Sequence, residues 1–145
     1  MKLLLLVHVA ATLIMFGVIL VVQIVHYPLF GQVGAESYVT YQAQHMRLIS
    51  IVVFPPMVVE LVTALLLVWW QPLGLPGWQV WLGLALVGVI WGSTALLQVP
   101  LHSALTDGFD ASAHRKLVAS NWVRTIAWGA RSVLVLAMLA PLLRR

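Results

Sequence analysis

Four long apolar runs decide what this chain can fold into. They cover about residues 3–25, 48–70, 78–99 and 117–143. Each reaches the roughly 20 residues that a helix needs to cross a hydrocarbon core about 30 Å thick. Because lipid offers no partners to backbone N–H and C=O groups, runs of this length are predicted to be helices. The sequence therefore predicts an all-α integral membrane protein, with one domain over residues 1–145.

The composition agrees with a membrane protein. Of the 145 residues, 62% are hydrophobic and only 8% are charged, whereas soluble domains carry about 25% charged residues. The net charge of +4 reflects scarce acids and not a basic tract, so we expect no nucleic-acid partner. The absence of cysteine excludes disulfides, iron–sulfur clusters and covalently attached haem. The first apolar run exceeds the core of a signal peptide, and we expect it to be retained.

The connections predict the order of the helices. The segment QPLGLPG, residues 71–77, is short and rich in Pro and Gly, which favours an antiparallel hairpin. The other two connections, about 26–47 and 100–116, are longer. An up-down-up-down four-helix bundle puts both on one side of the membrane and both termini on the other. The compact positive ends, Lys2 with Arg144 and Arg145, favour cytoplasmic termini, and we expect a bacterial inner-membrane protein.

A polar stripe interrupts the last apolar run. Asn121, Arg124, Trp128 and Arg131 are separated by three, four and three residues, so they share one helix face. Each arginine costs roughly 2.5–3.5 kcal/mol to insert into a bilayer, and the chain must offer partners. Glu60 and Arg131 lie at similar depths in their runs. We predict that Glu60 pairs with Arg131, with Arg124 as the alternative.

Four histidines are predicted to meet at one level of the bundle. The up-down order brings together His26, His45, His102 and His114, one from each helix. Facing helices often place metal ligands in a bundle core, and imidazole suits iron, copper or zinc. The four are therefore candidate ligands, and the alternative is that they cap helices or meet lipid headgroups. His8 lies toward the opposite end and is expected to be separate.

Two glutamines share helix faces with these histidines. Gln23 precedes His26 by three residues and Gln98 precedes His102 by four, so each pair projects to one side. We expect Gln23 and Gln98 to support the histidines through hydrogen bonds, and Trp128 to contact a bound cofactor.

Two local signals concern the helix paths. Pro55-Pro56 lies inside the second run and predicts a kink one turn before Glu60. The segment LTDGFDASAHRK predicts a turn at Asp107 and Asp110, with Ser112 as the N-cap of the last helix.

The last third of the chain resembles a known group. The segment QVPLHSALTDGFDASAHRKLVASNWVRTIAWGAR contains the pattern Asn-Trp-x-Arg-Thr-x-x-Trp-x-x-Arg. This pattern resembles the small four-helix membrane proteins of the anthrone oxygenase-like group. The resemblance rests on Asn121, Trp122, Arg124, Trp128 and Arg131. It implies oxygenation of a hydrophobic aromatic substrate.

These observations leave three functions open. In the first, the chain is a membrane oxidoreductase or oxygenase: Arg124 and Asn121 orient a lipophilic aromatic or quinone-like substrate, and Glu60 and Arg131 form the floor of the site. In the second, it is a non-catalytic subunit whose stripe binds a lipid, a pigment or a partner helix in a larger complex. In the third, Glu60 and the histidines form a proton path. With four helices and no inverted repeat, the third function requires a homo-oligomer.

Overall fold

The computed structural model of the chain describes residues 2–71 and 74–143, and its regular structure over these ranges is entirely helical. Four helical stretches are long and apolar enough to cross a membrane. They are Lys2–Gln32, Ala35–Trp69, Gly77–Ala104 and Ala111–Pro141. This confirms the prediction of four long apolar helices. Arg144 and Arg145, and Pro72 and Leu73 of the short connection, lie outside the described residues.

Two of the four stretches contain a widened turn. The first consists of α1 (Lys2–Val21), a π-helical segment (Val22–His26), α2 (Tyr27–Leu29) and a 3-10 turn (Phe30–Gln32). The second is the unbroken α3 (Ala35–Trp69). The third consists of α4 (Gly77–Ser93), a second π-helical segment (Thr94–Gln98) and α5 (Val99–Ala104), and the fourth is α6 (Ala111–Leu143).

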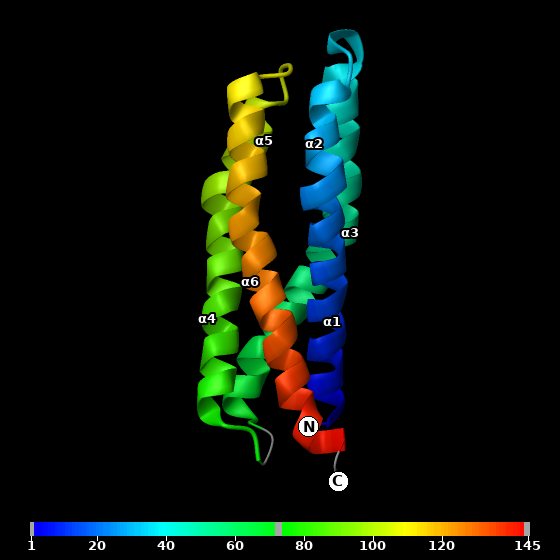
Figure 1. Cartoon of the computed structure of the whole chain (residues 1–145). Coiled ribbons are helices and arrows are strands. Elements are labelled where there is room, and N and C mark those ends of the chain that lie inside the picture. The colour runs from blue at the N-terminus through cyan, green and yellow to red at the C-terminus, as the bar shows by residue number, and fades with distance from the viewer. Residues whose placement is uncertain (1, 72–73, 144–145) are drawn as a thin grey trace.

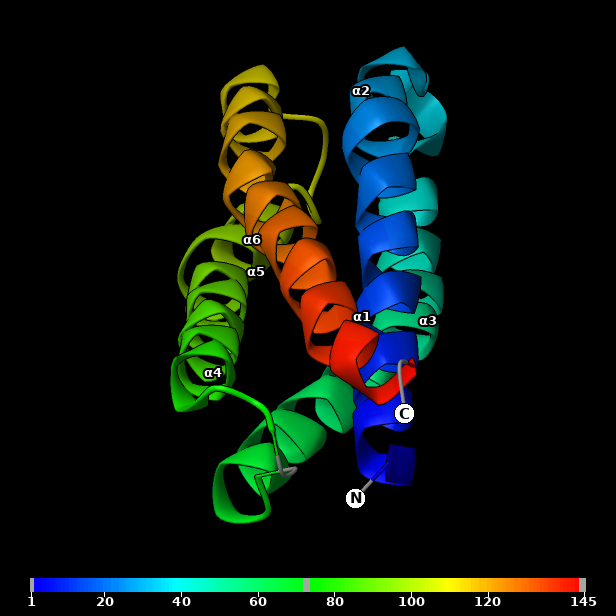
Figure 2. The ribbon, with the colours of Figure 1, turned by 60° about the horizontal axis from the view of Figure 1, so that its bottom comes forward.

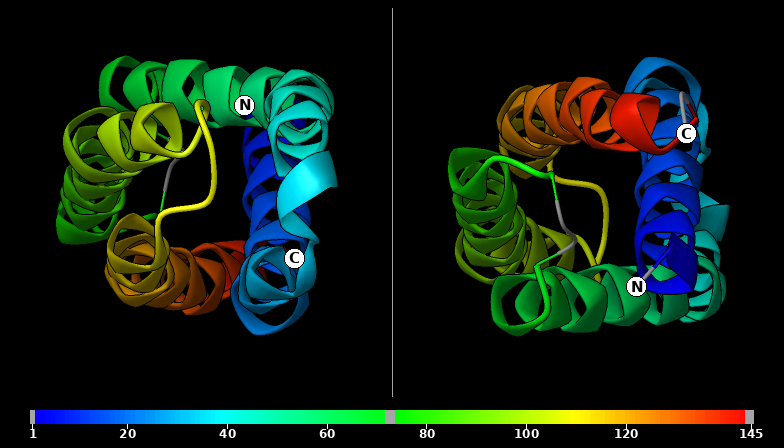
Figure 3. Two further views of the ribbon diagram at one scale, coloured as in Figure 1. Left: turned by 90° about the horizontal axis from the view of Figure 1, so that it is seen from above. Right: turned by 90° about the horizontal axis from the view of Figure 1, so that it is seen from below.

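The helices form a ring of four neighbours. α1 packs against α3 and α6, and α4 packs against the same two helices. Seen along the bundle axis, the four stretches therefore outline a square (Figure 3). Both ends of the chain lie at the end of the bundle where α3 is followed by α4, and the other connections lie at the opposite end (Figure 1).

α3 and α6 begin well before their apolar runs. α3 starts at Ala35, and its first turns bury Tyr38, Gln42 and His45, which are spaced by four and three residues and so share one face. Hydropathy marks only the apolar part of such a helix. For this reason His45 lies inside α3 and not at its start.

The proline pair lies within α3 without ending it. Pro55 and Pro56 are both helical, although proline removes backbone hydrogen bonds and clashes with the preceding turn. Beyond them α3 changes direction, and its second half runs across from α1 toward α4 (Figure 2). The predicted kink is therefore present, one turn before the buried Glu60.

The start of α6 differs from the prediction. The backbone N–H of Ala113 donates to Oδ1 of Asp110 at 2.7 Å, which makes Asp110 the N-cap. The prediction of Ser112 was wrong because α6 already begins at Ala111. The hydrogen bonds from the backbone N–H groups of Ala113 and Ser112 hold the pKa of the Asp110 carboxyl below its usual value.

Candidate functional site

The predicted ion pair between Glu60 and Arg131 is present in the core. Nε of Arg131 donates to Oε1 of Glu60 at 2.8 Å, and the two side chains are 0% and 1% exposed. Thr12 donates to the same carboxylate oxygen at 2.8 Å, and the indole N–H of Trp128 donates to Oε2 at 2.9 Å. Three donors from α1 and α6 therefore stabilise this carboxylate from α3.

His8, which we expected to be separate from the other four histidines, belongs to this network. Arg131 donates to Nε2 of His8 at 3.1 Å and also to the backbone carbonyl of Gly83. Because Nε2 of His8 accepts, its proton lies on Nδ1, which donates to the Thr63 hydroxyl at 2.7 Å. We refer to Glu60, Arg131, His8, their hydroxyl partners and the Gly83 carbonyl of α4 as the ion-pair layer. It joins all four helical stretches.

Arg124 lies about two turns before Arg131 on the same face of α6 and has a different environment. It donates to Oδ1 of Asn121 through Nε at 2.9 Å, to the Tyr27 hydroxyl at 3.2 Å and to the Thr94 hydroxyl at 3.4 Å. Its side chain is buried, with 8% exposed. Within residues 2–71 and 74–143, Glu60 and Arg131 form the only salt bridge, so Arg124 has only neutral partners there.

The two predicted glutamines both reach α6. Oε1 of Gln23 accepts from Asn121 at 2.8 Å, and Nε2 of Gln98 donates to the Ser120 hydroxyl at 3.2 Å. Neither lies within hydrogen-bonding distance of His26 or His102. Gln23 therefore supports Arg124 through Asn121, and not the histidines as predicted.

Both glutamines lie in the π-helical segments. In each stretch a proline follows the segment by two residues, Pro28 in one and Pro100 in the other. Proline cannot donate a backbone hydrogen bond and its ring crowds the carbonyl four residues earlier, and a widened turn relieves both problems. π segments are rare and concentrate at functional sites. Here each turns a glutamine into the core.

Three of the four predicted histidines come together. Nε2 of His26 and Nδ1 of His45 are 2.8 Å apart, and the rings of His45 and His102 have centroids 5.3 Å apart. Nε2 of His102 is 2.8 Å from the Tyr27 hydroxyl. His114 instead donates to the backbone carbonyl of Tyr27 at 2.8 Å.

Two hydrogen bonds and one ring contact link these three histidines and Tyr27 into a row. Across the described parts of the chain, no group of three or more His, Asp or Glu side chains is placed to hold a metal ion. Nε2 of His26 and Nδ1 of His45 bond to each other, and Nε2 of His102 bonds to Tyr27. Iron, copper or zinc binding by these residues stays a prediction.

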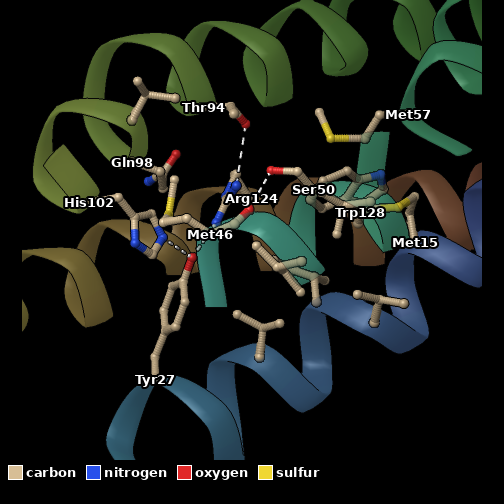
Figure 4. Close-up of a pocket in the computed structure, with 16 residues that line it drawn as sticks. Met15, Tyr27, Met46, Ser50, Met57, Thr94, Gln98, His102, Arg124 and Trp128 are labelled. Carbon is tan, nitrogen blue, oxygen red and sulfur yellow. Dashed lines mark hydrogen bonds between the residues drawn. The ribbon is translucent and has the colours of Figure 1, made fainter. Parts of the chain in front are cut away.

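An apolar cavity of about 120 Å³ lies beside Arg124. Its walls come from α1, both π segments, α2, α3, α5 and α6. Arg124 and His102 lie at one end of the cavity, and Trp128, Met15 and Met57 line the other (Figure 4). Exposed residues on α3 and α5 also line the cavity, namely Ser50 and Val99. The cavity therefore opens sideways between these two helices.

Several residues around the cavity and the histidines were not predicted from the sequence. Gln42 donates to Nδ1 of His102 at 3.2 Å and to its backbone carbonyl at 3.4 Å, while Tyr27 bridges His102 and Arg124. The seven-residue interval from Tyr38 through Gln42 to His45 was a usable signal, but it lies before the apolar run. The methionines that line the cavity carry no distinguishing pattern.

Comparison with known proteins gives no relative for this chain. No protein-family model matches it, and neither does any curated protein or solved structure. The resemblance to the anthrone oxygenase-like group stays an expectation.

Proposed function

We propose that the chain is an integral membrane protein that binds a lipophilic ring compound with a quinone-like oxygen in the cavity beside Arg124. The four stretches cross the bilayer as an up-down-up-down bundle with cytoplasmic termini, in a bacterial inner membrane. Their length and apolar character support the crossing of a bilayer. The rest of the proposal depends on Arg124.

The single observation that carries the proposal is the buried guanidinium without a carboxylate. Arg124 has three neutral partners, Asn121, Tyr27 and Thr94. A buried charge is costly unless it is paired, and Arg131 in the same helix shows the paired solution. An electron-rich ligand oxygen at the cavity end would give Arg124 a charge-assisted hydrogen bond. The polarity of this end contrasts with the apolar walls.

The size of the cavity selects the class of ligand. An apolar cavity of about 150 Å³ binds benzene, so 120 Å³ matches a single ring better than three fused rings. Met15, Met46 and Met57 line the cavity, and methionine adapts readily to a ligand. A tail attached to the ring leaves through the opening between α3 and α5. A monocyclic head with an alkyl tail fits these constraints.

Oxidoreductase or oxygenase chemistry would use the same end of the cavity. Arg124 stabilises negative charge on the ligand oxygen, and the Tyr27 hydroxyl next to it can exchange a proton. Trp128 lines the opposite wall, where it would contact the bound molecule. Glu60 and Arg131 act behind this wall and do not contact the ligand.

Binding of a para-benzoquinone with a decyl tail tests the proposal. The protein is purified in mild detergent without a histidine tag, and quinone quenching of tryptophan fluorescence gives the affinity. Arg124→Gln should weaken binding about tenfold or more, because a hydrogen bond to a charged group contributes about 1.5–3 kcal/mol. Arg115→Gln is the matched control, since Arg115 is exposed on the same helix.

Equal affinity in the Arg124 and Arg115 variants would contradict the proposal. The chain would then be better described as a non-catalytic membrane subunit, and purification from membranes in very mild detergent would be used to identify its complex. Elemental analysis of the same sample decides whether iron, copper or zinc is present.

A further inference from the structure

A row of ring side chains leads from the outer surface of the bundle to the cavity. His26 and His45 both line a surface groove of about 270 Å³ on α3. The row continues from His45 to His102 and from there to Tyr27, which contacts Arg124. We infer that this row is a proton path that delivers protons from the groove to the ligand oxygen at Arg124. The inference rests on the proposed function and assigns a role to the histidines within it.

The hydrogen bonds around His102 determine which of its two ring nitrogens carries the proton. The Gln42 amide donates to the backbone carbonyl of His102 at 3.4 Å, which orients the amide so that its N–H₂ also faces Nδ1 of that ring at 3.2 Å. Nδ1 therefore accepts, and Nε2 carries the proton and donates to the Tyr27 hydroxyl at 2.8 Å. Gln42 thus sets the tautomer of His102.

This tautomer leaves the hydroxyl proton of Tyr27 available to a ligand. The Tyr27 oxygen accepts from His102 at 2.8 Å and from Arg124 at 3.2 Å. With both acceptor positions used, its own O–H is free to donate. Tyr27 lines the cavity together with Arg124, so the hydroxyl can donate to the same ligand oxygen that Arg124 binds.

The step from His45 to His102 lies among unpartnered buried atoms. Nε2 of His45 and Oε1 of Gln42 have no hydrogen-bond partner in the described structure, although the two side chains are at most 6% exposed. Buried polar atoms are normally satisfied by protein or by ordered water. One bridging water or a small rotation of the His45 ring connects its Nε2 to His102.

The transfer moves one proton and no electrons. His26 takes a proton from the groove and passes one from Nε2 to Nδ1 of His45. As His45 releases its Nε2 proton to Nδ1 of His102, the Gln42 amide turns over, so that its Oε1 accepts from this nitrogen and its N–H₂ no longer donates to it. His102 gives its own Nε2 proton to the Tyr27 oxygen. Tyr27 gives its hydroxyl proton to the ligand oxyanion, so each group gains and loses one proton.

Other titratable groups lie off this row. His114 donates to the backbone carbonyl of Tyr27 and not to its hydroxyl. Glu60, Arg131 and His8 bond to one another in the ion-pair layer. Tyr41 borders the same groove as His26 and lies at the outer end. The row therefore begins at the groove, where His26 is its outer member, and ends at Tyr27.

The test measures the rate at which a bound oxyanion is protonated. The probe is a para-nitrophenol with a decyl tail, whose coloured phenolate reports its own ionisation. The complex in detergent is mixed rapidly with acidic buffer, and the absorbance decay is recorded. His45→Gln should slow the decay about tenfold or more, on the scale of a lost acid–base group, while the probe affinity changes less than about twofold. The matched control His114→Gln should leave the rate unchanged.

Chemical rescue separates proton transfer from a structural role. Imidazole added to His45→Ala should restore the rate, because it fits the space of the removed ring, whereas a variant that had merely lost its structure would not recover. An unchanged rate in His45→Gln, or no recovery with imidazole, overturns the proton path.

The same probe distinguishes the two proposals. Binding that depends on Arg124 combined with an unchanged rate in His45→Gln overturns the path alone and leaves the binding site intact. Probe binding that does not depend on Arg124 overturns both.

Discussion

Trp128 donates its indole N–H to Oε2 of Glu60 at 2.9 Å, and the same ring forms a wall of the cavity beside Arg124. Trp128 is completely buried. The ion-pair layer therefore holds the cavity wall in place without touching what the cavity binds. Changes in this layer are expected to alter both stability and binding.

Replacing Trp128 tests this connection. Trp128→Phe removes the hydrogen bond to Glu60 and part of the cavity wall. We expect a loss of about 1.5–3 kcal/mol in the free energy of unfolding, the range for hydrogen bonds to charged groups, and weaker quinone binding. Denaturant unfolding in detergent measures the first effect. Trp122→Phe is the control, because Trp122 is 47% exposed on the same helix and should change neither quantity.

The ion pair is expected to show strong coupling. Glu60→Leu leaves the Arg131 guanidinium buried without its carboxylate, and breaking a buried pair costs about 3–5 kcal/mol. The double variant with Arg131→Met removes both charges and should be more stable than Glu60→Leu alone. The double-mutant cycle compares wild type, Glu60→Leu, Arg131→Met and the double variant by thermal unfolding in one detergent. Strictly additive losses would show that the two residues contribute independently.

Asp110 should make the stability of α6 depend on pH. Its carboxylate accepts backbone N–H bonds from Ala113 and Ser112, which lowers its pKa from about 3.8. A depressed pKa in the folded state stabilises the protein above the unfolded value, and the contribution disappears as the pH falls through the folded value. Asp110→Ala should therefore lower the unfolding temperature near neutral pH, and the difference from wild type should vanish in acid. Asp110→Asn keeps a capping oxygen and should lose much less.

The absence of cysteine makes the orientation directly measurable. Asp107 lies in the connection between α5 and α6, and Gln71 lies at the opposite end of the bundle after α3; both are exposed. With cytoplasmic termini, a membrane-impermeant maleimide added to intact cells should label Asp107→Cys and not Gln71→Cys. Both should be labelled after lysis. The reverse pattern would invert the orientation, and labelling of both in intact cells would contradict a spanning bundle.

The sequence predicts the ion pair because lipid makes charges expensive. Glu60 and Arg131 lie at similar depths in two apolar runs, and few other charges were available as partners. The four helices follow from the same physics, since runs of about 20 apolar residues have few alternatives. Both inferences use the position of a residue within an apolar run and the free energy of placing charge in lipid, and both quantities can be estimated from the sequence.

The helix faces are harder to infer, because they depend on local winding. The two π segments shift the phase of their helices, so Gln23 and Gln98 turn toward α6. His114 lies seven residues before Asn121 on α6, about 10 Å further along the axis at 1.5 Å per residue, and meets the backbone of Tyr27. The depth of a residue along the bundle, estimated from the ends of the apolar runs, does not show such changes in helix phase and axial position. Each π segment does have a signal, the proline two residues after it.

The sideways opening between α3 and α5 determines which part of a ligand is recognised. A compound that enters from the bilayer leaves surroundings as apolar as the walls formed by Met15, Met57 and Val53. Transfer of its ring from lipid to protein therefore gains little free energy from the hydrophobic effect. Selection among the many lipophilic compounds of a membrane then depends on the oxygen that meets Arg124. The cavity discriminates by head group and tolerates variation in the tail.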